Sequence, residues 1–162
     1  FFMNQAKNLN NSFEKHNHEE CISRSIVSLD QYCKKNGFNF TPVRKKVFEI
    51  LLENHKATGA YEVLDRLRQD GFGSQPPVVY RALDFLVKLG FVHKIERLNA
   101  FITCDYFGKC SIPIFLICRI CKTVCETNSR MSHEKLFDGT THLDFRIENS
   151  VIETVGVCPA CS

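Results

Sequence analysis

Apolar residues recur at helical spacing through the first half of the chain and predict four helices. The first covers residues 20–36 and stops at Gly37. The second starts at Thr41-Pro42, because threonine can cap exposed backbone amides and proline fits the first helical turn. The third runs from about Gly59 to Gln69, and the fourth follows Pro76-Pro77 and ends at Gly90. The apolar positions expected to face the core are Ile22, Ile26, Val27 and Leu29, then Val43, Val47, Ile50 and Leu51, then Val63, Leu64 and Leu67, and finally Val79, Leu83 and Leu86.

Two strands are predicted directly after the fourth helix, over residues 91–97 and 100–105, joined by Leu98-Asn99. Helices followed by a two-stranded hairpin are the order of a winged helix-turn-helix, whose last helix before the wing enters the DNA major groove. Tyr80 and Arg81 fall on the first turn of that helix. Arginine can donate two hydrogen bonds to guanine, and a tyrosine ring can pack on a thymine methyl group.

Further candidate DNA contacts lie on the second and third helices. Arg44 and Lys45 crowd the first turns of the second helix, and Tyr61 shares one stripe of the third helix with Asp65 and Arg68. For Asp65 and Arg68, an intrahelical ion pair is the alternative. Residues 1–99 carry 15 lysine and arginine residues against 11 acidic ones, within a formal net charge of +3. This modest excess is compatible with a nucleic-acid partner and too small to prove one.

Beyond Tyr106 the pattern changes to short strands, predicted over residues 112–118, 123–126, 143–147 and 150–155, with a short helix over 129–138. This small α/β unit has few long apolar stretches, and a unit of this size usually needs a metal or a partner chain. The sequence therefore predicts an α+β protein in three parts. A mobile tail over residues 1–19 precedes a winged-helix domain over 20–105 and a small C-terminal α/β domain over 106–162.

The overall composition is that of a soluble globular protein. The chain has 162 residues, of which 44% are hydrophobic and 24% charged. No apolar run approaches the roughly 20 residues that span a bilayer, and the polar start of the chain lacks a signal-peptide core. We therefore expect a cytoplasmic protein without a membrane partner.

Nine cysteines are the most informative residues of the chain. An odd number without a secretion signal argues against a disulfide scaffold. The pairs Cys118/Cys121 and Cys158/Cys161 are two C-x-x-C motifs, and together they can complete a tetrahedral four-sulfur site of the kind that holds structural zinc. The alternative is a pair of redox-active thiols.

A second group of potential ligands is scattered over the region where the two parts meet. His93 lies in the first wing strand, Cys104 in the second, Cys110 in a loop, and Glu126 just after the first C-x-x-C. Mixed nitrogen, sulfur and oxygen ligands make a more exchangeable site than four thiolates. Taken singly, His93 could be an exposed strand histidine, Cys104 a buried apolar side chain and Glu126 a solvated charge.

Catalytic motifs are not evident in the sequence. His133-Glu134 matches neither a zinc protease nor a zinc deaminase, and there is no phosphate loop or nucleophile elbow. This disfavours an enzyme, with a thiol redox enzyme using Cys118 and Cys121 as the remaining candidate.

The order and spacing of several motifs resemble the ferric-uptake-regulator family, most closely its zinc-uptake-regulator branch. The resemblance covers roughly residues 25–162. It is carried by Gly59-Ala60-Tyr61, the stretch Pro76 to Leu86, Gly90 to Lys94, Val151-Ile152-Glu153 and the two C-x-x-C pairs.

The resemblance implies a bacterial cytosolic homodimer with an N-terminal winged helix and a C-terminal dimerisation domain. It implies a metal-loaded repressor of an A/T-rich palindromic operator in double-stranded DNA. Cys118, Cys121, Cys158 and Cys161 match the family's structural zinc site. His93, Cys104 and Glu126 match three regulatory ligands.

The chain departs from the family at the fourth regulatory ligand. The family's histidine before the first C-x-x-C is absent, and Cys110 is the available donor, one position away. The histidine-rich run of iron-sensing and peroxide-sensing members is also absent, which favours zinc, since sulfur donors suit zinc. We therefore expect a zinc-responsive repressor of zinc-uptake genes with one structural and one regulatory Zn²⁺ per chain. The alternatives are a member that answers iron, manganese or peroxide, or the thiol redox enzyme.

Overall fold

The computed structural model describes residues 18–53, 56–73, 75–105, 107, 112–128, 137, 142–148 and 150–162. It divides into two compact units, and the division falls between Cys104 and Asp105. Most of the tail predicted over residues 1–19 lies outside the described residues. The first helix begins at His18, two residues before the predicted start. No helix in the described part of the chain is long and apolar enough to cross a membrane.

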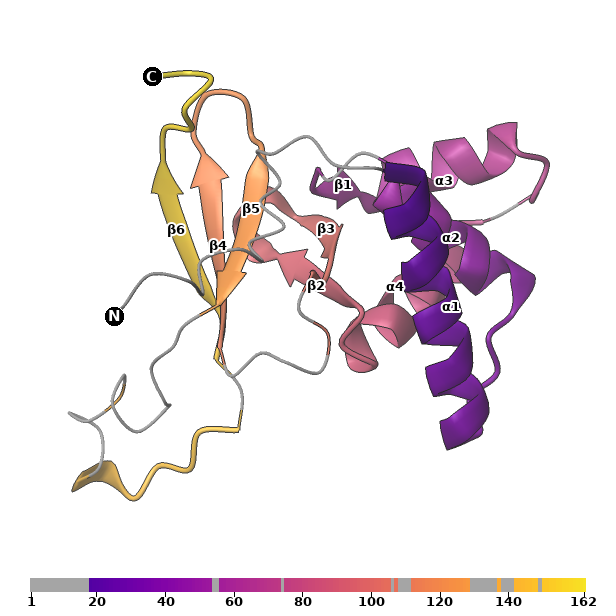
Figure 1. Ribbon diagram of the computed structural model, residues 1–162, viewed down its shortest axis with the longest axis horizontal. Helices are drawn as coiled ribbons and strands as arrows, with labels where there is room; N and C mark the ends of the chain where they lie inside the picture. Colours follow the sequence, from indigo (N-terminus) through magenta and orange to yellow (C-terminus); the bar gives the residue numbers. More distant parts are fainter. Residues whose placement is uncertain are drawn as a thin grey trace, which may run out of the picture. The chain divides into compact units, whose positions relative to one another are not determined.

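The N-terminal unit consists of four helices and a small antiparallel sheet (Figure 1). The helices are α1 (His18–Asn36), α2 (Pro42–Leu52), α3 (Ala60–Gln69) and α4 (Pro76–Lys88). The strands are β1 (Thr58–Gly59), β2 (Val92–Ile95) and β3 (Ala100–Thr103), in the order β1-β3-β2. All four predicted helices are present, so the mixed α+β character expected from the sequence is confirmed for this unit.

The helix ends follow the capping chemistry of the sequence. The Thr41 side chain accepts a hydrogen bond from the Arg44 backbone N–H at 3.4 Å, and Pro42 starts α2. At the C-terminal end of α4, Gly90 has a φ of +79°. Its N–H donates to the Val87 carbonyl, and the Phe91 N–H donates to the Leu86 carbonyl. This left-handed cap stops the helix and turns the chain into β2.

The core of the N-terminal unit lies between the helices and the sheet. Phe91 packs edge-on against Phe48 and Tyr32, with ring centroids 6.1 and 5.6 Å apart. Most of the predicted apolar stripes are buried; those of α2 to α4 include Val47, Ile50, Leu51, Val63, Leu64, Leu67, Val79, Leu83 and Leu86. Val27 is an exception, since it is 53% exposed. A single apolar residue on the solvent side of a helix is ordinary in soluble proteins.

The predicted two-stranded hairpin is present with shorter strands and a different connection. A 3₁₀-helix (η1, Glu96–Leu98) joins β2 to β3, and Val92 lies opposite Thr103. The sequence analysis missed β1, whose two residues pair with Ala100 and Phe101. Two residues are too few to show an alternating pattern, so only the tertiary pairing defines this strand.

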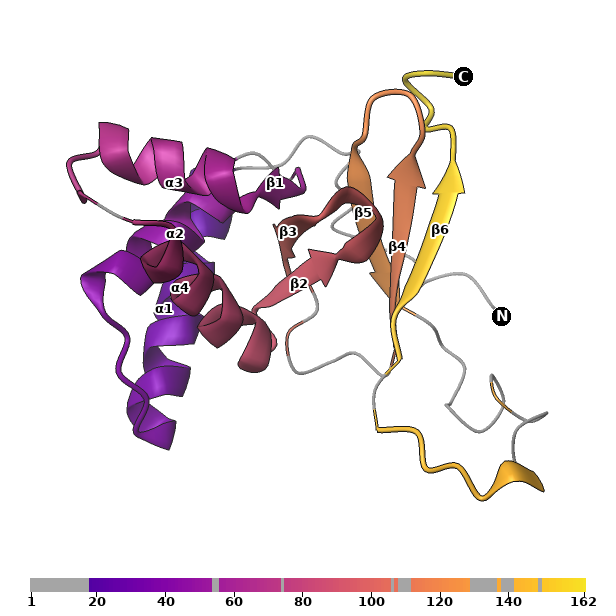
Figure 2. The ribbon, with the colours of Figure 1, turned by 180° about the vertical axis from the view of Figure 1, so that it is seen from behind.

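The C-terminal unit is built on a three-stranded sheet (Figure 2). Its strands are β4 (Pro113–Cys118), β5 (Val124–Asn128) and β6 (Ile152–Gly156), in the order β5-β4-β6. β4 runs antiparallel to β5 and parallel to β6. Three of the predicted strands are thus present, with ends displaced by one or two residues. The helix predicted over 129–138 lies outside the described residues apart from Phe137.

The strand predicted over residues 143–147 is wrong. His142 and Leu143 form a short 3₁₀ turn, and residues 145–148 have no regular structure. Leu143 and Phe145 are 60% and 71% exposed. Their alternation with polar residues imitates a half-buried strand, but no described strand pairs with them, and period-2 alternation alone supplies no hydrogen-bond partners.

Asn99 generates a test of the connection between β2 and β3. It has φ +46° and ψ +46°, and its N–H donates to the Glu96 carbonyl at 3.1 Å. We expect Asn99→Val to lower the free energy of unfolding by about 1–2 kcal/mol, because a β-branched residue is strained in the left-handed region. Asn99→Gly should leave it nearly unchanged. Urea unfolding of both variants measures this, and equal stability of the two would contradict the assigned backbone conformation.

Candidate metal centres and DNA-facing residues

The two C-x-x-C motifs meet at one edge of the C-terminal sheet. Cys118 is the last residue of β4, and Cys158 follows the end of β6 by two residues. Because β4 and β6 are parallel neighbours, with Cys118 opposite Gly156, both loops leave the sheet at the same edge. The sulfur atoms of Cys118, Cys121, Cys158 and Cys161 all lie within 4.8 Å of one another.

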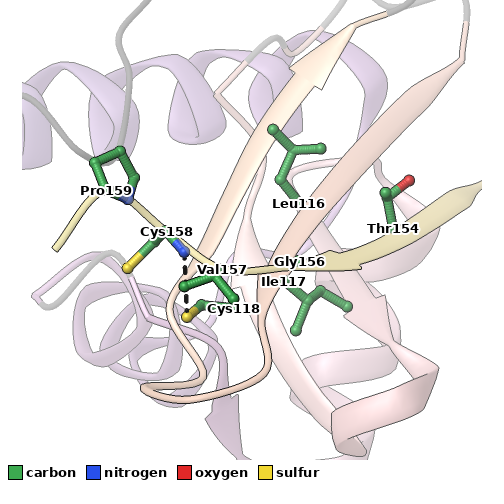
Figure 3. A pocket seen from close by; sticks show the side chains of 8 residues that line it. All are labelled: Leu116, Ile117, Cys118, Thr154, Gly156, Val157, Cys158 and Pro159. Atoms are coloured by element: carbon green, nitrogen blue, oxygen red, sulfur yellow. Dashed lines mark hydrogen bonds between the residues drawn. The ribbon is translucent and has the colours of Figure 1, made fainter. Parts of the chain in front are cut away.

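Backbone hydrogen bonds shape each loop around the sulfur atoms. The Cys118 N–H donates to the Thr123 carbonyl at 2.9 Å, and Lys122 adopts a left-handed φ of +62° that closes the first turn. The Cys161 N–H donates to the Cys158 carbonyl and closes the second. Figure 3 shows the Cys158 backbone nitrogen directed at the Cys118 sulfur, at 3.4 Å. The backbone of the second loop thus donates a hydrogen bond directly to a sulfur atom of the first.

The electrostatics of the cluster favour the thiolate form of Cys118 and Cys121, the two cysteines of the first C-x-x-C motif. Backbone hydrogen bonds, first from Cys121 and then from Cys158, lower the pKa of Cys118 to about 6. A side-chain hydrogen bond with Thr123, 3.2 Å away, lowers the pKa of Cys121. Hydrogen bonding to Cys158 and then Cys121 raises the pKa of Cys161 to about 12. The set therefore shares protons between neighbouring sulfur atoms, an arrangement that a bound cation converts to thiolates.

The spacing fits a zinc ion. Tetrahedral zinc with zinc–sulfur bonds of about 2.3 Å places its ligands about 3.8 Å apart. The Cys121 and Cys158 sulfur atoms are 3.6 Å apart. The sequence analysis did not identify Thr123 as part of this cluster. The only indication in the sequence is its position two residues after the first cysteine pair. Cys125 is buried but is not one of the four clustered sulfurs.

His93 and Cys104 lie on the same face of the β2–β3 hairpin. The Cys104 N–H donates to the Phe91 carbonyl at 2.9 Å, so Cys104 continues the β2–β3 pairing one step beyond Val92 and Thr103. His93 is two residues after Phe91 and therefore points to the same side. Cys104 and His93 are diagonal neighbours across the pair, within reach of long side chains. Both are half-buried.

Glu126 is the unusual residue of the C-terminal sheet, because it is charged yet only 1% exposed. It lies on β5 opposite Phe115, and its Oε2 accepts a hydrogen bond from the Asp105 N–H at 2.8 Å. A buried carboxylate is costly unless hydrogen bonds or a cation compensate it. Asp105 directly follows Cys104 in the chain. The fourth predicted ligand, Cys110, lies outside the described residues.

The candidate DNA contacts are mostly on exposed parts of the helices. Tyr61 on α3 and Tyr80 on α4 are 68% and 41% exposed, although both carry large rings. Arg81 is exposed, and its Nε donates to the Pro77 carbonyl at 3.2 Å. The exposed Lys45 has only a long contact of 3.9 Å with Glu49. Arg44 differs, since it is half-buried.

Asp65 and Arg68 form the intrahelical pair given as their alternative. Their charged atoms are 3.9 Å apart, and both side chains are largely exposed. An exposed pair of this kind contributes little to stability.

The chain was compared with known proteins once this geometry was in hand. The zinc uptake regulation protein of Escherichia coli K12 is 32% identical over 137 residues, which cover 84% of this chain and 80% of the relative. The chain belongs to the zinc uptake regulator family. The same identity and coverage hold for the zinc uptake regulation protein of Shigella flexneri. No family model matches the chain.

Solved structures of zinc uptake regulators share the fold. A zinc uptake regulator complexed with zinc and DNA has a TM-score of 0.79 and 31% identity, with 91% of this chain and 96% of that chain covered. Holo XcZur has a TM-score of 0.76 and 34% identity, with 86% and 97% covered. The resemblance to this family predicted from the sequence is confirmed.

The four-cysteine cluster generates a test of whether its sulfur atoms bind zinc. The four cysteines lie where β4 and β6 end, so a zinc ion bound there would join the two strands and contribute folding free energy directly. We therefore expect Cys118→Ser to lose one zinc per chain and to yield little soluble protein. Cys125→Ala is the matched control, a buried cysteine of the same sheet outside the cluster, and should keep its zinc. Metal analysis and size-exclusion chromatography decide. A soluble Cys118→Ser protein with full zinc content would contradict the assignment.

Proposed function

We propose that the chain is a zinc-responsive transcriptional repressor of zinc-uptake genes, acting as a homodimer on an A/T-rich palindromic operator in the bacterial cytoplasm. The observation that carries the DNA-binding part is the outward placement of Tyr80 and Arg81 on α4. The family membership and the four-cysteine cluster support the zinc part.

The N-terminal unit has the element order of a winged helix-turn-helix. Helices α2, α3 and α4 are followed by the β2–β3 hairpin, which would be the wing. In such domains the N-terminal residues of the recognition helix read bases. Because α4 begins at Pro76, Tyr80 and Arg81 lie on its second turn, and the expectation of the first turn was wrong. We assign Arg81 to a guanine edge and Tyr80 to a thymine methyl group. Lys45 and Tyr61 belong to the surrounding phosphate-facing surface.

The two zinc ions proposed for each chain would have different functions. A structural ion held by the four clustered cysteines would stabilise the C-terminal unit. A regulatory ion would be held by His93, Cys104 and Glu126, with Cys110 as fourth donor. Support comes from the shared face of His93 and Cys104 and from the burial of the Glu126 carboxylate. Mixed ligands bind zinc less permanently than four thiolates, which suits a sensor.

The C-terminal unit carries features of a dimerisation domain. In the described sheet β6 is an edge strand; Val155 on β6, Val157 just beyond it and Leu116 on the neighbouring β4 are each about 40% exposed. An edge strand with exposed apolar side chains favours pairing with another chain. A dimer could present two α4 helices to successive major grooves, about 34 Å apart.

Two other functions are less well supported. A member that answers iron, manganese or peroxide would fit the fold, but the relatives listed above are named for zinc uptake. A thiol redox enzyme would use Cys118 and Cys121 alone, whereas four sulfur atoms are gathered here. Thiol titration distinguishes the last case, because bound zinc masks four thiols.

The decisive experiment is selection of DNA sequences by the purified protein with added zinc, with iron or manganese, and with a chelator. The proposal expects a palindromic motif that is enriched only with zinc. Enrichment with iron alone, or no enrichment under any condition, would refute it.

Arg81→Ala tests the assignment of the recognition helix. Loss of a bidentate base contact should cost about 1–3 kcal/mol of specific binding and leave dimerisation intact. Lys45→Ala should instead weaken binding to all sequences alike and flatten the salt dependence, as loss of a phosphate contact does. Titrations over a range of salt concentrations separate these patterns. Parent-like operator binding by Arg81→Ala would show that α4 does not read this base.

Cys104→Ser tests the regulatory site. The variant should remain folded and dimeric, because the four-cysteine cluster and the N-terminal core are untouched. It should hold one zinc fewer per chain and no longer tighten on DNA when zinc is added. Cys110→Ser should show the same defect in weaker form. Metal analysis and DNA titrations with and without zinc provide the measurement, and a fully zinc-responsive Cys104→Ser would end the sensor hypothesis.

A further inference from the structure

Arg44 makes contacts that differ from those of its basic neighbours. Its guanidinium carbon lies 3.7 Å from the centroid of the Phe85 ring, and its Nη1 donates to the Asn39 backbone carbonyl. No carboxylate in the described part of the chain forms an ion pair with it. Lys45 is exposed, and Lys46 pairs with Asp70 at 2.9 Å. Arg44 thus links the segment before α2 to a side chain of α4.

Phe85 lies on the same helix as the proposed base-reading residue Arg81. It is four residues after Arg81, so the two side chains emerge on the same face of the helix, one turn apart. Phe38 packs edge-on against Phe85, with centroids 6.3 Å apart, and stacks near Tyr32 at 6.4 Å. The Arg44 stack is therefore continuous with the aromatic contacts that join α1, the α1–α2 connection and α4.

We propose that Arg44 is a positioning residue for DNA recognition, which fixes the orientation of α4 through Phe85 and thereby the direction of Arg81. This inference rests on the proposed function. It also separates Arg44 from Lys45, although the sequence analysis gave both as candidate DNA contacts. A flat guanidinium can stack on a ring while its edge donates to a carbonyl, whereas a lysine ammonium cannot make both contacts in the same way.

Three variants distinguish positioning from a phosphate contact. Arg44→Lys keeps the charge and loses the stack, Phe85→Leu loses the ring, and Lys45→Met is the matched control at the neighbouring position. Each is titrated with the palindrome recovered by zinc selection and with a random duplex of equal length, over a range of salt. Circular dichroism fixes a temperature at which every variant is folded.

If Arg44 is a positioning residue, Arg44→Lys should bind the palindrome about tenfold more weakly than the parent does. This is the order of effect expected when one base contact is misplaced. Its binding to the random duplex and its salt slope should match the parent. Phe85→Leu should give a similar loss, and the double variant should lose little more than either single one, because both remove the same contact. Parent-like palindrome binding by Arg44→Lys, or fully additive losses in the double variant, would overturn the proposal.

Amide hydrogen exchange without DNA tests the same idea independently of function. Arg44→Lys should speed exchange along α4, residues 80–85, relative to the parent and to Lys45→Met. Unchanged α4 exchange in Arg44→Lys would overturn the proposal even if DNA binding fell. If the parent itself binds no DNA, the proposed function fails, while faster α4 exchange would still support the structural link between Arg44 and α4.

Discussion

The parallel pairing of β4 with β6 is the constraint on which the C-terminal unit depends. It carries Cys118 and Cys158 to the same edge of the sheet, although 40 positions separate them in the sequence. Among the residues of this unit that the structure describes, few large apolar side chains are buried, chiefly Ile112, Phe115, Ile117 and Val124. Four sulfur atoms closing on one ion would supply the cross-link that so small a core lacks, because metal binding then becomes folding free energy.

The N-terminal unit is stabilised in a different way. Its helices bury continuous apolar stripes, and Phe91 packs against Phe48 and Tyr32. Polar contacts also join its helices, since Lys46 on α2 pairs with Asp70 beyond α3. The buried side chains described for this unit are nearly all apolar. Loss of the proposed regulatory zinc should therefore change how the protein binds DNA, whereas loss of the clustered cysteines should change whether it folds.

Local chemistry was readable from the sequence, and partners distant along the chain were not. Thr41-Pro42 and Gly90 mark helix ends through their own backbone preferences, and C-x-x-C spacing marks a turn around a metal. Residues 143–147 have a strand pattern without a strand, because pairing requires a neighbour that no local pattern specifies. No local pattern predicted the β4–β6 register. The stacking of Arg44 on Phe85 could not be predicted either, because Phe85 lies on a different helix.

The short path from α4 to the wing gives the proposed sensor a mechanical connection to DNA recognition. α4 ends at Lys88 and β2 begins at Val92, so His93 is the fifth residue after the helix. The cap at Gly90 and the burial of Phe91 leave little freedom between the two elements. The hairpin and α4 should therefore move as one body, and a regulatory zinc ion bound to His93 and Cys104 would act on that body. In this scheme the metal need not touch the DNA, because restricting the freedom of this body lowers the entropic cost of placing α4 in the groove.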